Sequence, residues 1–502
     1  MDHFRITSRG SQAVTQEERS TMAHALTRRR FLQRTLSGAT GLLVGSLLTA
    51  CQGSATSNTP TPGTSSSGPT PSTSKSPTPA QTPTRTTSGA AFSGKLTVWG
   101  VVSFTKEGDQ LLGQQMVDWG KQHNVQVEYN PLPGSDYLNK VAAAVEAKAL
   151  PDIVMMENEQ AVYYAAQGHL VDLTDVYNEL KGLAGGIYET LLPYCTVDNK
   201  VYAIPMQADV SVMYARLDLC EKATEKREPP KTLDALEEIA RKVQSPPTLY
   251  GIGFVLGRTP DGQGNMTQLL FADGGLLVNE KGEPALDSPA TVAALERLQR
   301  WWKDKLIPPD SISADDAWNN KMYQSGQAAF VFNPASIYAY LEKNDPQLLS
   351  NTAQAPFPDG KGKARQSAGT WSWAIAATSK NIEAAKALLL AIMQPDKIEQ
   401  VYEKVGGRWY PVYRDLANAP FWKQRPYFDL FPQIIANSQP GWAPAPASPK
   451  LLAQLSAFNQ RFVLSDMAQD VLINNKSPQE AVKAAQSKME QIFQDTAKSL
   501  GG

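Results

Sequence analysis

Downstream of residue 93, apolar and polar positions follow two alternating patterns. Short continuous apolar runs are typical of buried strands, whereas apolar residues three and four positions apart are typical of helices. The two patterns predict strands at 95–101, 125–129 and 151–156, and helices at 108–122, 136–150 and 160–167. A strand–helix order repeated three times predicts an α/β fold with a parallel sheet and helices on both of its faces.

The ends of the predicted strands indicate a binding edge. Ligands of parallel sheets lie beyond the carboxyl ends of the strands. Trp99 and Gly100 end the first strand, and Glu157, Asn158 and Glu159 follow the third. We therefore expect these residues at the edge where a ligand would lie.

The first 50 residues have the pattern of an export signal. The basic run TRRRFL at 27–32 precedes a short apolar, Gly-rich segment at 36–50, which ends in Leu48-Thr49-Ala50 before Cys51. Such a segment is too short for a membrane span, which needs ~20 residues. The sequence LTAC resembles the lipobox of bacterial lipoproteins, and TRRRFL resembles a twin-arginine motif with Gln33 at the usual lysine position. The resemblance implies that Cys51 is lipidated and anchors the mature chain to the membrane.

Two further features lie on either side of this signal. Residues 1–25 are polar and precede the arginines, so a start at Met22 instead of Met1 would give a signal of ordinary proportions. Residues 51–93 consist almost entirely of Ser, Thr, Pro, Gly and Ala, which cannot bury a core and predict a disordered tether. Fully extended at ~3.1 Å per residue, the tether would reach on the order of 100 Å.

The remaining 94–502 segment is long enough for two lobes. Nine of the 48 Lys and Arg residues and three of the 49 Asp and Glu residues precede Gly94, so this segment carries 39 bases and 46 acids, a net charge of −7. A negative charge of this size argues against nucleic acid as a partner. Cys195 and Cys220 either form a disulfide, which export permits, or remain free buried thiols.

Several landmarks occur in a characteristic order along this segment. They are a strand ending in Trp99-Gly100, PDIV at 151–154, NKVYAIP at 199–205, VMYA at 212–215, GQAAF at 326–330, GTWSWAI at 369–375, a helix at 382–393, a loop at 406–411, and a capping box at Ser477. In this order they resemble bacterial extracellular solute-binding proteins of the sugar-binding ABC-transporter type. The resemblance covers 95–493.

This resemblance implies a type II periplasmic-binding-protein-like fold, with two α/β lobes joined by a multi-crossing hinge. Lobe 1 would comprise 94–205 and 372–405, and lobe 2 would comprise 206–371 and 406–502, including the hinge crossings. The implied function is capture of a carbohydrate outside the cytoplasm and its delivery to the permease subunits of an ABC importer. We expect a monomer that performs no chemistry and needs no cofactor or metal.

Sugars present C–H faces to aromatic rings and hydroxyl rims to carboxylates, amides and arginine. Residues of these types at element ends near the expected cleft are the candidate ligand contacts: Trp99, Tyr137, Glu157, Asn158, Asp209, Trp318, Trp371 and Arg408.

Each candidate also has a purely structural interpretation. Trp99 could pack between the lobes, Trp318 within a helix, and the Glu157–Asn158 pair could cap the next helix. Asp209 could be a solvated turn carboxylate. Arg408 could bind a hydroxyl or carboxylate, or pair across the lobes.

Two tryptophans in one predicted strand are expected to have opposite roles. Trp371 and Trp373 alternate with Ser372, so they point to opposite faces of an extended segment. We predict that Trp371 contacts the ligand and that Trp373 belongs to the core.

Other functions remain alternatives. A secreted carbohydrate-active enzyme could use Glu157 and Asp209 as a carboxylate pair, but 94–502 contains only two histidines, His123 and His169, and no HExxH, GxSxG or GxxxxGK[ST] motif. The same fold could bind a polyol phosphate, which would need a convergent basic site, or a polyamine, which would need several cleft carboxylates.

Overall fold

The computed structural model describes residues 92–362, 364, 368–438 and 448–500. All of them belong to one compact unit, Thr86–Gly502. The export signal, the lipidation site Cys51 and almost all of the predicted tether lie outside the described residues.

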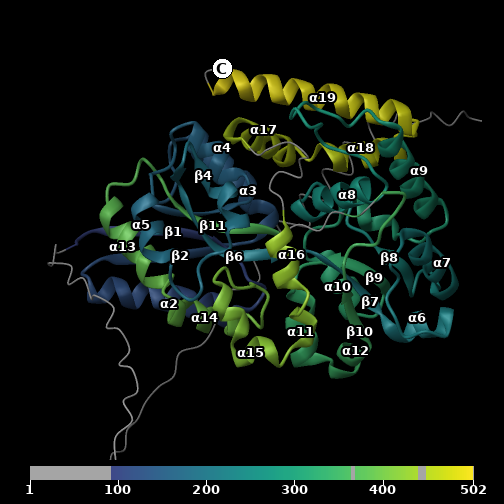
Figure 1. The fold of residues 1–502 in the computed structure, drawn as a ribbon, viewed down its shortest axis with the longest axis horizontal. Helices are drawn as coiled ribbons and strands as arrows, with labels where there is room; N and C mark the ends of the chain where they lie inside the picture. Colours follow the sequence, from purple (N-terminus) through teal and green to yellow (C-terminus); the bar gives the residue numbers. More distant parts are fainter. Residues whose placement is uncertain (1–91, 363, 365–367, 439–447, 501–502) are drawn as a thin grey trace, which may run out of the picture. The chain divides into compact units, whose positions relative to one another are not determined.

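Five strands form the first sheet, in the order β2-β1-β3-β11-β6. Figure 1 labels β1, β2, β6 and β11 of this sheet. Their bounds are β1 Lys95–Val101, β2 Gln126–Leu132, β3 Ile153–Glu157, β6 Ala203–Val210 and β11 Ala368–Ile375. β1 pairs in parallel with β2 and β3, which confirms the three predicted strands and their parallel pairing. β11 is antiparallel to both β3 and β6, so the whole sheet is mixed.

Helices lie between and beside these strands, and those near 108–122, 136–150, 160–167 and 382–393 confirm the predicted ones. The helices are α2 Lys106–Gln122, α3 Gly134–Glu146, α4 Gln160–Ala166, α5 Thr174–Leu180, α13 Ile382–Ile392 and α14 Pro395–Lys404. α2 packs on β2, α13 and α14, and α13 also packs on α5. Between α5 and β6, the 3-10 helix η1 Glu189–Cys195 leads into the hairpin of β4 Thr196–Val197 and β5 Lys200–Val201, whose turn residues Asp198 and Asn199 both have positive φ.

Four strands form the second sheet, in the order β10-β7-β9-β8. Their bounds are β7 Val212–Arg216, β8 Tyr250–Gly253, β9 Ala328–Asn333 and β10 Thr352–Ala355. The accompanying helices are α6 Leu217–Thr224, α7 Leu233–Val243, α8 Pro260–Ala272, α9 Pro289–Lys303, η2 Pro309–Ser313, α10 Trp318–Gln324, α11 Ser336–Asn344 and α12 Pro346–Ser350. The chain passes from the first sheet to the second at Ser211, between β6 and β7, and returns between β10 and β11.

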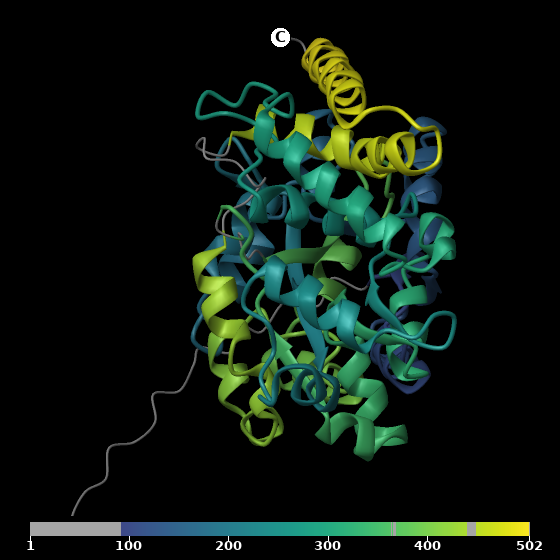
Figure 2. The ribbon, with the colours of Figure 1, turned by 90° about the vertical axis from the view of Figure 1, so that its right-hand side faces the viewer.

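The last helices contact elements of both sheets. They are η3 Arg414–Asn418, α15 Pro420–Lys423, η4 Pro426–Phe428, α16 Phe431–Asn437, α17 Pro449–Gln460, α18 Val463–Leu472 and α19 Pro478–Ser499. α17 packs on α4, α18 packs on α8 and α9, and α19 covers α17 and α18 at one end of the two sheets (Figure 2). α16 lies against β6 and η1. The predicted assignment of all of 406–502 to the second lobe stays a prediction.

The capping box predicted for the last helix is confirmed. The Ser477 hydroxyl accepts from the Glu480 backbone N–H, and the Glu480 carboxylate accepts from the Ser477 backbone N–H at 3.0 Å. Each bond satisfies a donor that the helix start would otherwise leave free.

Two hydrophobic clusters fill the molecule, one around each sheet. Trp373 is fully buried in the first cluster, which confirms its predicted place in the core. Trp301 is fully buried in the second, with Trp302 half-buried against it.

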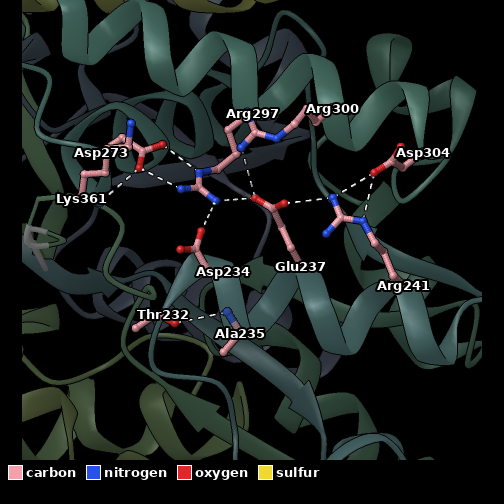
Figure 3. Close-up of polar contacts among 10 residues, drawn as sticks. All are labelled: Thr232, Asp234, Ala235, Glu237, Arg241, Asp273, Arg297, Arg300, Asp304 and Lys361. Carbon is pink, nitrogen blue, oxygen red and sulfur yellow. Dashed lines mark hydrogen bonds and ion pairs between the residues drawn. The ribbon is translucent and has the colours of Figure 1, made fainter.

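An arginine-centred ion cluster ties together the helices on one side of the second sheet (Figure 3). Arg297 on α9 donates from Nε to Asp273 Oδ2 at 2.8 Å, from Nη1 to Asp234 Oδ1 at 2.8 Å, and also from Nη1 to Glu237. Asp273, Glu237 and Arg297 are all buried. Asp273 also accepts the backbone N–H of Lys361, so the cluster reaches the segment that leads back to the first sheet.

Cys195 and Cys220 are both free and buried, which decides between the two alternatives left open by the sequence. The Cys195 thiol lies 3.2 Å from the Ser372 hydroxyl. Burial raises the pKa of Cys195 to about 12 and that of Cys220 to about 11, so both stay protonated thiols at neutral pH.

Candidate functional site

A cavity lies between the two sheets, at the carboxyl end of β3. We call it the central cavity. It contains about 820 Å³ of space not occupied by atoms, part of it open to solvent. It is lined by Glu157, Asn158, Tyr194, Asp209, Ser211, Val212, Pro260, Asp261, Gly264, Asn265, Gln268, Phe332, Pro334, Phe357 and Gly369. Its position is the one expected for the ligand of a sheet whose first strands are parallel.

Glu157 and Asn158 reach the central cavity because β3 ends there. Asn158 has a φ of +43°, a left-handed conformation that Asn tolerates better than most residues. Its backbone N–H donates to Thr370 O at 2.8 Å, and its Oδ1 accepts from Thr370 N at 3.0 Å. A Cβ on the preceding Gly369 would overlap Asn158 Oδ1, so glycine is required for this close approach.

Asp209 enters from β6, and its partner is Arg408. Arg408 Nη1 lies 3.3 Å from Asp209 Oδ1, and the two side chains are 11% and 21% exposed. Arg408 is held near β6 because Ala208 N donates to Tyr410 O at 2.9 Å. Arg408 therefore forms an ion pair with Asp209, whereas its predicted role in pairing across the lobes stays a prediction. The ion pair does not exclude a ligand contact by the remaining N–H groups of Arg408.

Helix α8 supplies the opposite wall. Asp261, Asn265 and Gln268 recur at helical spacing, so they share one face of α8. The Nδ2 of Asn265 and the Oε1 of Gln268 are buried and have no hydrogen-bond partner among the described residues. The residues are 7% and 8% exposed, so these groups are buried polar atoms that a bound molecule could satisfy.

The sequence analysis does not predict the contribution of α8, although the sequence contains a signal for it. The helix begins with an N-cap at Thr259, whose side chain accepts from Gly262 N, and continues with Pro260 at its first position. The spacing of Asp261, Asn265 and Gln268 at i, i+4 and i+7 is that signal, although Gln263 and Thr267 in the same helix are polar as well.

Burial and neighbouring carboxylates raise the pKa of two carboxyl groups that line the central cavity. Burial, followed by repulsion from Asp209 and Asp316, raises the pKa of Glu157 well above its ordinary range. Burial, followed by repulsion from Asp316, does the same for Asp261. Asp316 lies behind Asp261 and accepts its backbone N–H at 3.3 Å. Asp261 in turn accepts from Asn319 Nδ2 at 2.9 Å.

Aromatic rings complete the wall on the side of the second sheet. Phe332 and Phe357 stack with centroids 4.4 Å apart and an interplanar angle of 30°. Tyr194 also lines the central cavity. The cavity thus combines apolar ring surface with carboxylates and amides, which is the combination that binds sugars.

An adjoining cavity shares Glu157, Asn158, Pro260 and Gly264 with the central cavity. Its lining also includes Glu159, which is buried at the start of α4. Burial raises the pKa of Glu159 to about 7, against a smaller opposing effect of its hydrogen bonds, including one to the Asn459 side chain. The adjoining cavity extends the space available to a ligand toward α17.

Four of the predicted ligand contacts are placed away from the lining of the central cavity. Trp99 is half-buried with Lys140 Nζ 4.4 Å from its ring centroid. Trp318 is half-buried, and its Nε1 donates to Asp310 Oδ2 at 2.9 Å. Tyr137 and Trp371 are buried and meet edge to face with centroids 5.8 Å apart.

Tyr137 has a clear structural role. Its hydroxyl donates to Met155 O at 2.8 Å, lies 3.1 Å from Trp99 O, and accepts from Met155 N at 3.0 Å, so it bridges β1 and β3. Ligand contact by Trp99, Tyr137, Trp318 and Trp371 stays a prediction. Of the other candidates, Glu157, Asn158 and Asp209 line the central cavity, and Arg408 stands behind Asp209.

Comparison with known protein families decides the classification. Residues 114–429 match the family described as bacterial extracellular solute-binding protein. The chain belongs to this family. Its members are substrate-binding proteins of the extracytoplasmic compartment, and the predicted family resemblance is confirmed.

This solute-binding protein has curated relatives at low identity. It is 27% identical over 318 residues to a "Probable ABC transporter-binding protein" of Deinococcus radiodurans, covering 59% of this chain and 70% of the relative. It is 26% identical to a "Lactose-binding protein" of Rhizobium radiobacter, covering 60% and 65%. It is 24% identical to the "Maltodextrin-binding protein MdxE" of Bacillus subtilis, covering 42% and 51%.

Solved structures confirm the fold. The chain aligns with maltose-bound MalE3 of T. maritima with a TM-score of 0.70 and 22% identity, over 80% of this chain and 100% of that one. It aligns with a laminaribiose-bound sugar transporter protein of Arthrobacter chlorophenolicus with a TM-score of 0.69 and 17% identity, over 79% and 99%. The predicted type II, two-lobed periplasmic-binding-protein fold is therefore confirmed.

Two negative features of the described residues concern membrane spans and metal sites. None of their helices is both long and apolar enough to cross a bilayer. The same residues contain no group of three or more His, Cys, Asp and Glu side chains arranged to hold a metal ion.

Proposed function

We propose that this solute-binding protein captures a carbohydrate in the central cavity and delivers it to the permease subunits of an ABC importer. The observation that carries the proposal is that one cavity is lined both by side-chain amides of α8 without hydrogen-bond partners and by the stacked rings of Phe332 and Phe357. Family membership supports solute capture, and two relatives, a lactose-binding protein and a maltodextrin-binding protein, support a sugar as the solute.

Closure of the two lobes would couple capture to delivery. The lining comes from both sheets, so a ligand that contacts Glu157 on β3 and Gln268 on α8 stabilises the closed arrangement. The predicted lobes are 94–205 with 372–405, and 206–371 with 406–502. A permease that binds the closed monomer more tightly than the open one would then bind mainly the ligand-loaded protein.

The test is a thermal-shift screen with mono- and oligosaccharides. A ligand that binds only the folded state must raise the melting temperature, by an amount that grows with its concentration. We expect at least one sugar to raise it reproducibly and to be recovered unchanged after prolonged incubation. Release of product would instead support a carbohydrate-active enzyme, and the absence of any sugar-dependent shift would contradict the proposal.

The proposed location includes a membrane anchor. The sequence LTAC before the Ser/Thr/Pro-rich 51–93 segment supports lipidation of Cys51, and the Arg28-Arg29 pair supports twin-arginine export. Mass spectrometry of the membrane fraction should find a lipid-modified Cys51, and Cys51→Ser should release or stall the protein. An unmodified Cys51 in that fraction would contradict the anchor. Equal export of an Arg28→Lys/Arg29→Lys variant in cells lacking the twin-arginine pathway would contradict that route.

A further inference from the structure

The charge of the central cavity is one-sided. Glu157, Asp209 and Asp261 all line it, and its lining, which consists of described residues, includes no Lys, Arg or His. Arg408 pairs with Asp209 but lines a different cavity, next to Ser103 and Phe104, which we call the outer cavity. The central cavity therefore presents three carboxyl groups to any occupant and has one cation behind its wall.

Such crowding is costly in a partly buried site. Like-charged carboxylates in a cavity of low polarity raise each other's free energy, and burial and mutual repulsion do raise the pKa of Glu157 and Asp261. Asp316 adds a further carboxyl group just behind Asp261. A cation in the cavity would stabilise the ionised carboxylates, whereas with a neutral occupant burial and repulsion would continue to favour the protonated acids.

The unpartnered amides supply independent evidence that a polar ligand is expected here. Gln268 offers a buried acceptor at Oε1, and Asn265 offers a buried donor at Nδ2, and neither has a partner among the described residues. Both side chains are more than nine-tenths buried. The occupant must therefore carry an acceptor as well as donors, as a molecule with both hydroxyl and amino groups does.

We propose that the ligand of the central cavity is an aminated sugar that carries at least one protonated amine. Its ammonium group donates to the carboxylates of Glu157, Asp209 and Asp261, a hydroxyl or ring oxygen accepts from Asn265 Nδ2, and a C–H face of the sugar ring lies against Phe332. This inference rests on the proposed function and narrows its substrate class. A primary ammonium has three N–H donors, which equals the number of carboxyl groups that line the central cavity.

The experiment compares sugars that differ only in the amine. Calorimetric titrations at pH 7 would compare glucosamine to glucose and galactosamine to galactose. The chitosan disaccharide would be compared both to its N-acetylated form and to cellobiose. Spermidine would serve as an amine without a sugar ring. We expect at least one aminated sugar to bind about tenfold or more tightly than its neutral partner, because charge-assisted hydrogen bonds are stronger than neutral ones.

The outcomes separate the two proposals. Neutral sugars that bind as tightly as, or more tightly than, their aminated partners would overturn this inference and leave carbohydrate capture intact. Binding of spermidine without binding of any sugar would overturn carbohydrate capture itself. A panel in which no aminated sugar binds would also overturn the inference.

Variants of the cavity carboxyl groups show which of them contact the amine of the ligand. Asp261→Asn and Glu157→Gln keep the shape of the side chain and remove its charge, so each should reduce the advantage of the aminated sugar over its neutral partner about tenfold while leaving the neutral partner nearly unaffected. Asp261 also accepts a hydrogen bond from Asn319, so Asp261→Asn could misfold. Glu157→Gln then still tests the inference. The control is Asp118→Asn on the exposed face of α2. An unchanged advantage in both cavity variants would overturn the inference.

Discussion

Arg408 Nη1 and Asp209 Oδ1 lie 3.3 Å apart and join positions 199 residues apart in the chain. Asp209 lines the central cavity, and Arg408 lines the outer cavity. The ion pair therefore stands in the wall between the two cavities. Both side chains are largely buried, so their contact is less screened by water than the surface pairs of the molecule.

Removing the arginine should weaken this wall. Arg408→Gln leaves the largely buried Asp209 carboxylate without its cation, and we expect a loss of about 1–3 kcal/mol in the free energy of unfolding. The matched control is Lys343→Gln, because Lys343 pairs with Glu107 at 3.6 Å but is 72% exposed. Urea denaturation measures both variants, and an equal, negligible loss in the two would contradict a structural role for the Arg408 pair.

Gly369→Ala should disturb the end of β3. A methyl group there overlaps Asn158 Oδ1, so either the amide gives up its bond from Thr370 N or β11 shifts. We expect a loss of about 1–3 kcal/mol in stability, together with weaker ligand binding. Gly182→Ala serves as control, since a Cβ at Gly182 meets no heavy atom within 4 Å. Thermal melts of the two variants that coincide with wild type would show that the approach of Gly369 to Asn158 is not tight.

Glu159 should make stability depend on pH in a defined window. Its folded-state pKa of about 7 lies above its ordinary 4.5, so the folded protein holds a proton that the unfolded chain releases. The stabilising contribution is complete below pH 4.5 and is lost as the pH rises through about 7, at about 1.4 kcal/mol per pH unit, or about 3 kcal/mol in all.

The Glu159→Gln variant isolates this effect because it stays neutral at every pH. We expect it to be more stable than wild type at pH 8 by about 2–3 kcal/mol, with a much smaller difference at pH 5. Glu280→Gln, at an exposed position, should show no such pH-dependent difference from wild type. Denaturation curves at the two pH values test the prediction, which fails if the difference between Glu159→Gln and wild type is the same at both.

Substitution of Arg297 should lower stability more than substitution of most other residues in the helices around the second sheet. Arg297→Leu leaves the buried carboxylates of Asp273 and Glu237 without their main partner, which should cost about 3–5 kcal/mol. Arg300→Leu is the control, because Arg300 is 51% exposed and lies 3.7 Å from Glu237. Its loss should stay below about 1 kcal/mol. Equal losses in urea denaturation would contradict the central place of Arg297 in the cluster.

The sequence predicted the end of β3 well because the physics there is local. A continuous buried run, IVMM, has to stop where Glu157 and Asn158 introduce polar side chains, and the first parallel strands place that end at a binding edge. The face of α8 escaped prediction for the opposite reason. Polar residues spaced along a helix are typical of a solvent-exposed face, but in the fold α8 packs on α9, α17 and α18, and Asn265 and Gln268 are buried.

Trp371 shows a second limit of local patterns. Alternation predicted the buried position of Trp373, but it did not predict that Trp371 is only 6% exposed as well; ligand contact by Trp371 stays a prediction. β11 lies between β3 and β6, so elements packed on both faces of the sheet cover the strand. The position of β11 in the sheet depends on pairing with strands more than 150 residues away, which no short pattern contains.

The most direct test of the account is a calorimetric titration of the sugar that gives the largest thermal shift, performed on wild type, Gln268→Ala and Gln400→Ala. Gln268 lines the central cavity with an unpartnered Oε1, whereas Gln400 lies on the exposed side of α14. We predict that Gln268→Ala weakens binding about tenfold and that Gln400→Ala leaves it unchanged. Wild-type affinity in a correctly folded Gln268→Ala variant would contradict the claim that the central cavity is the ligand site.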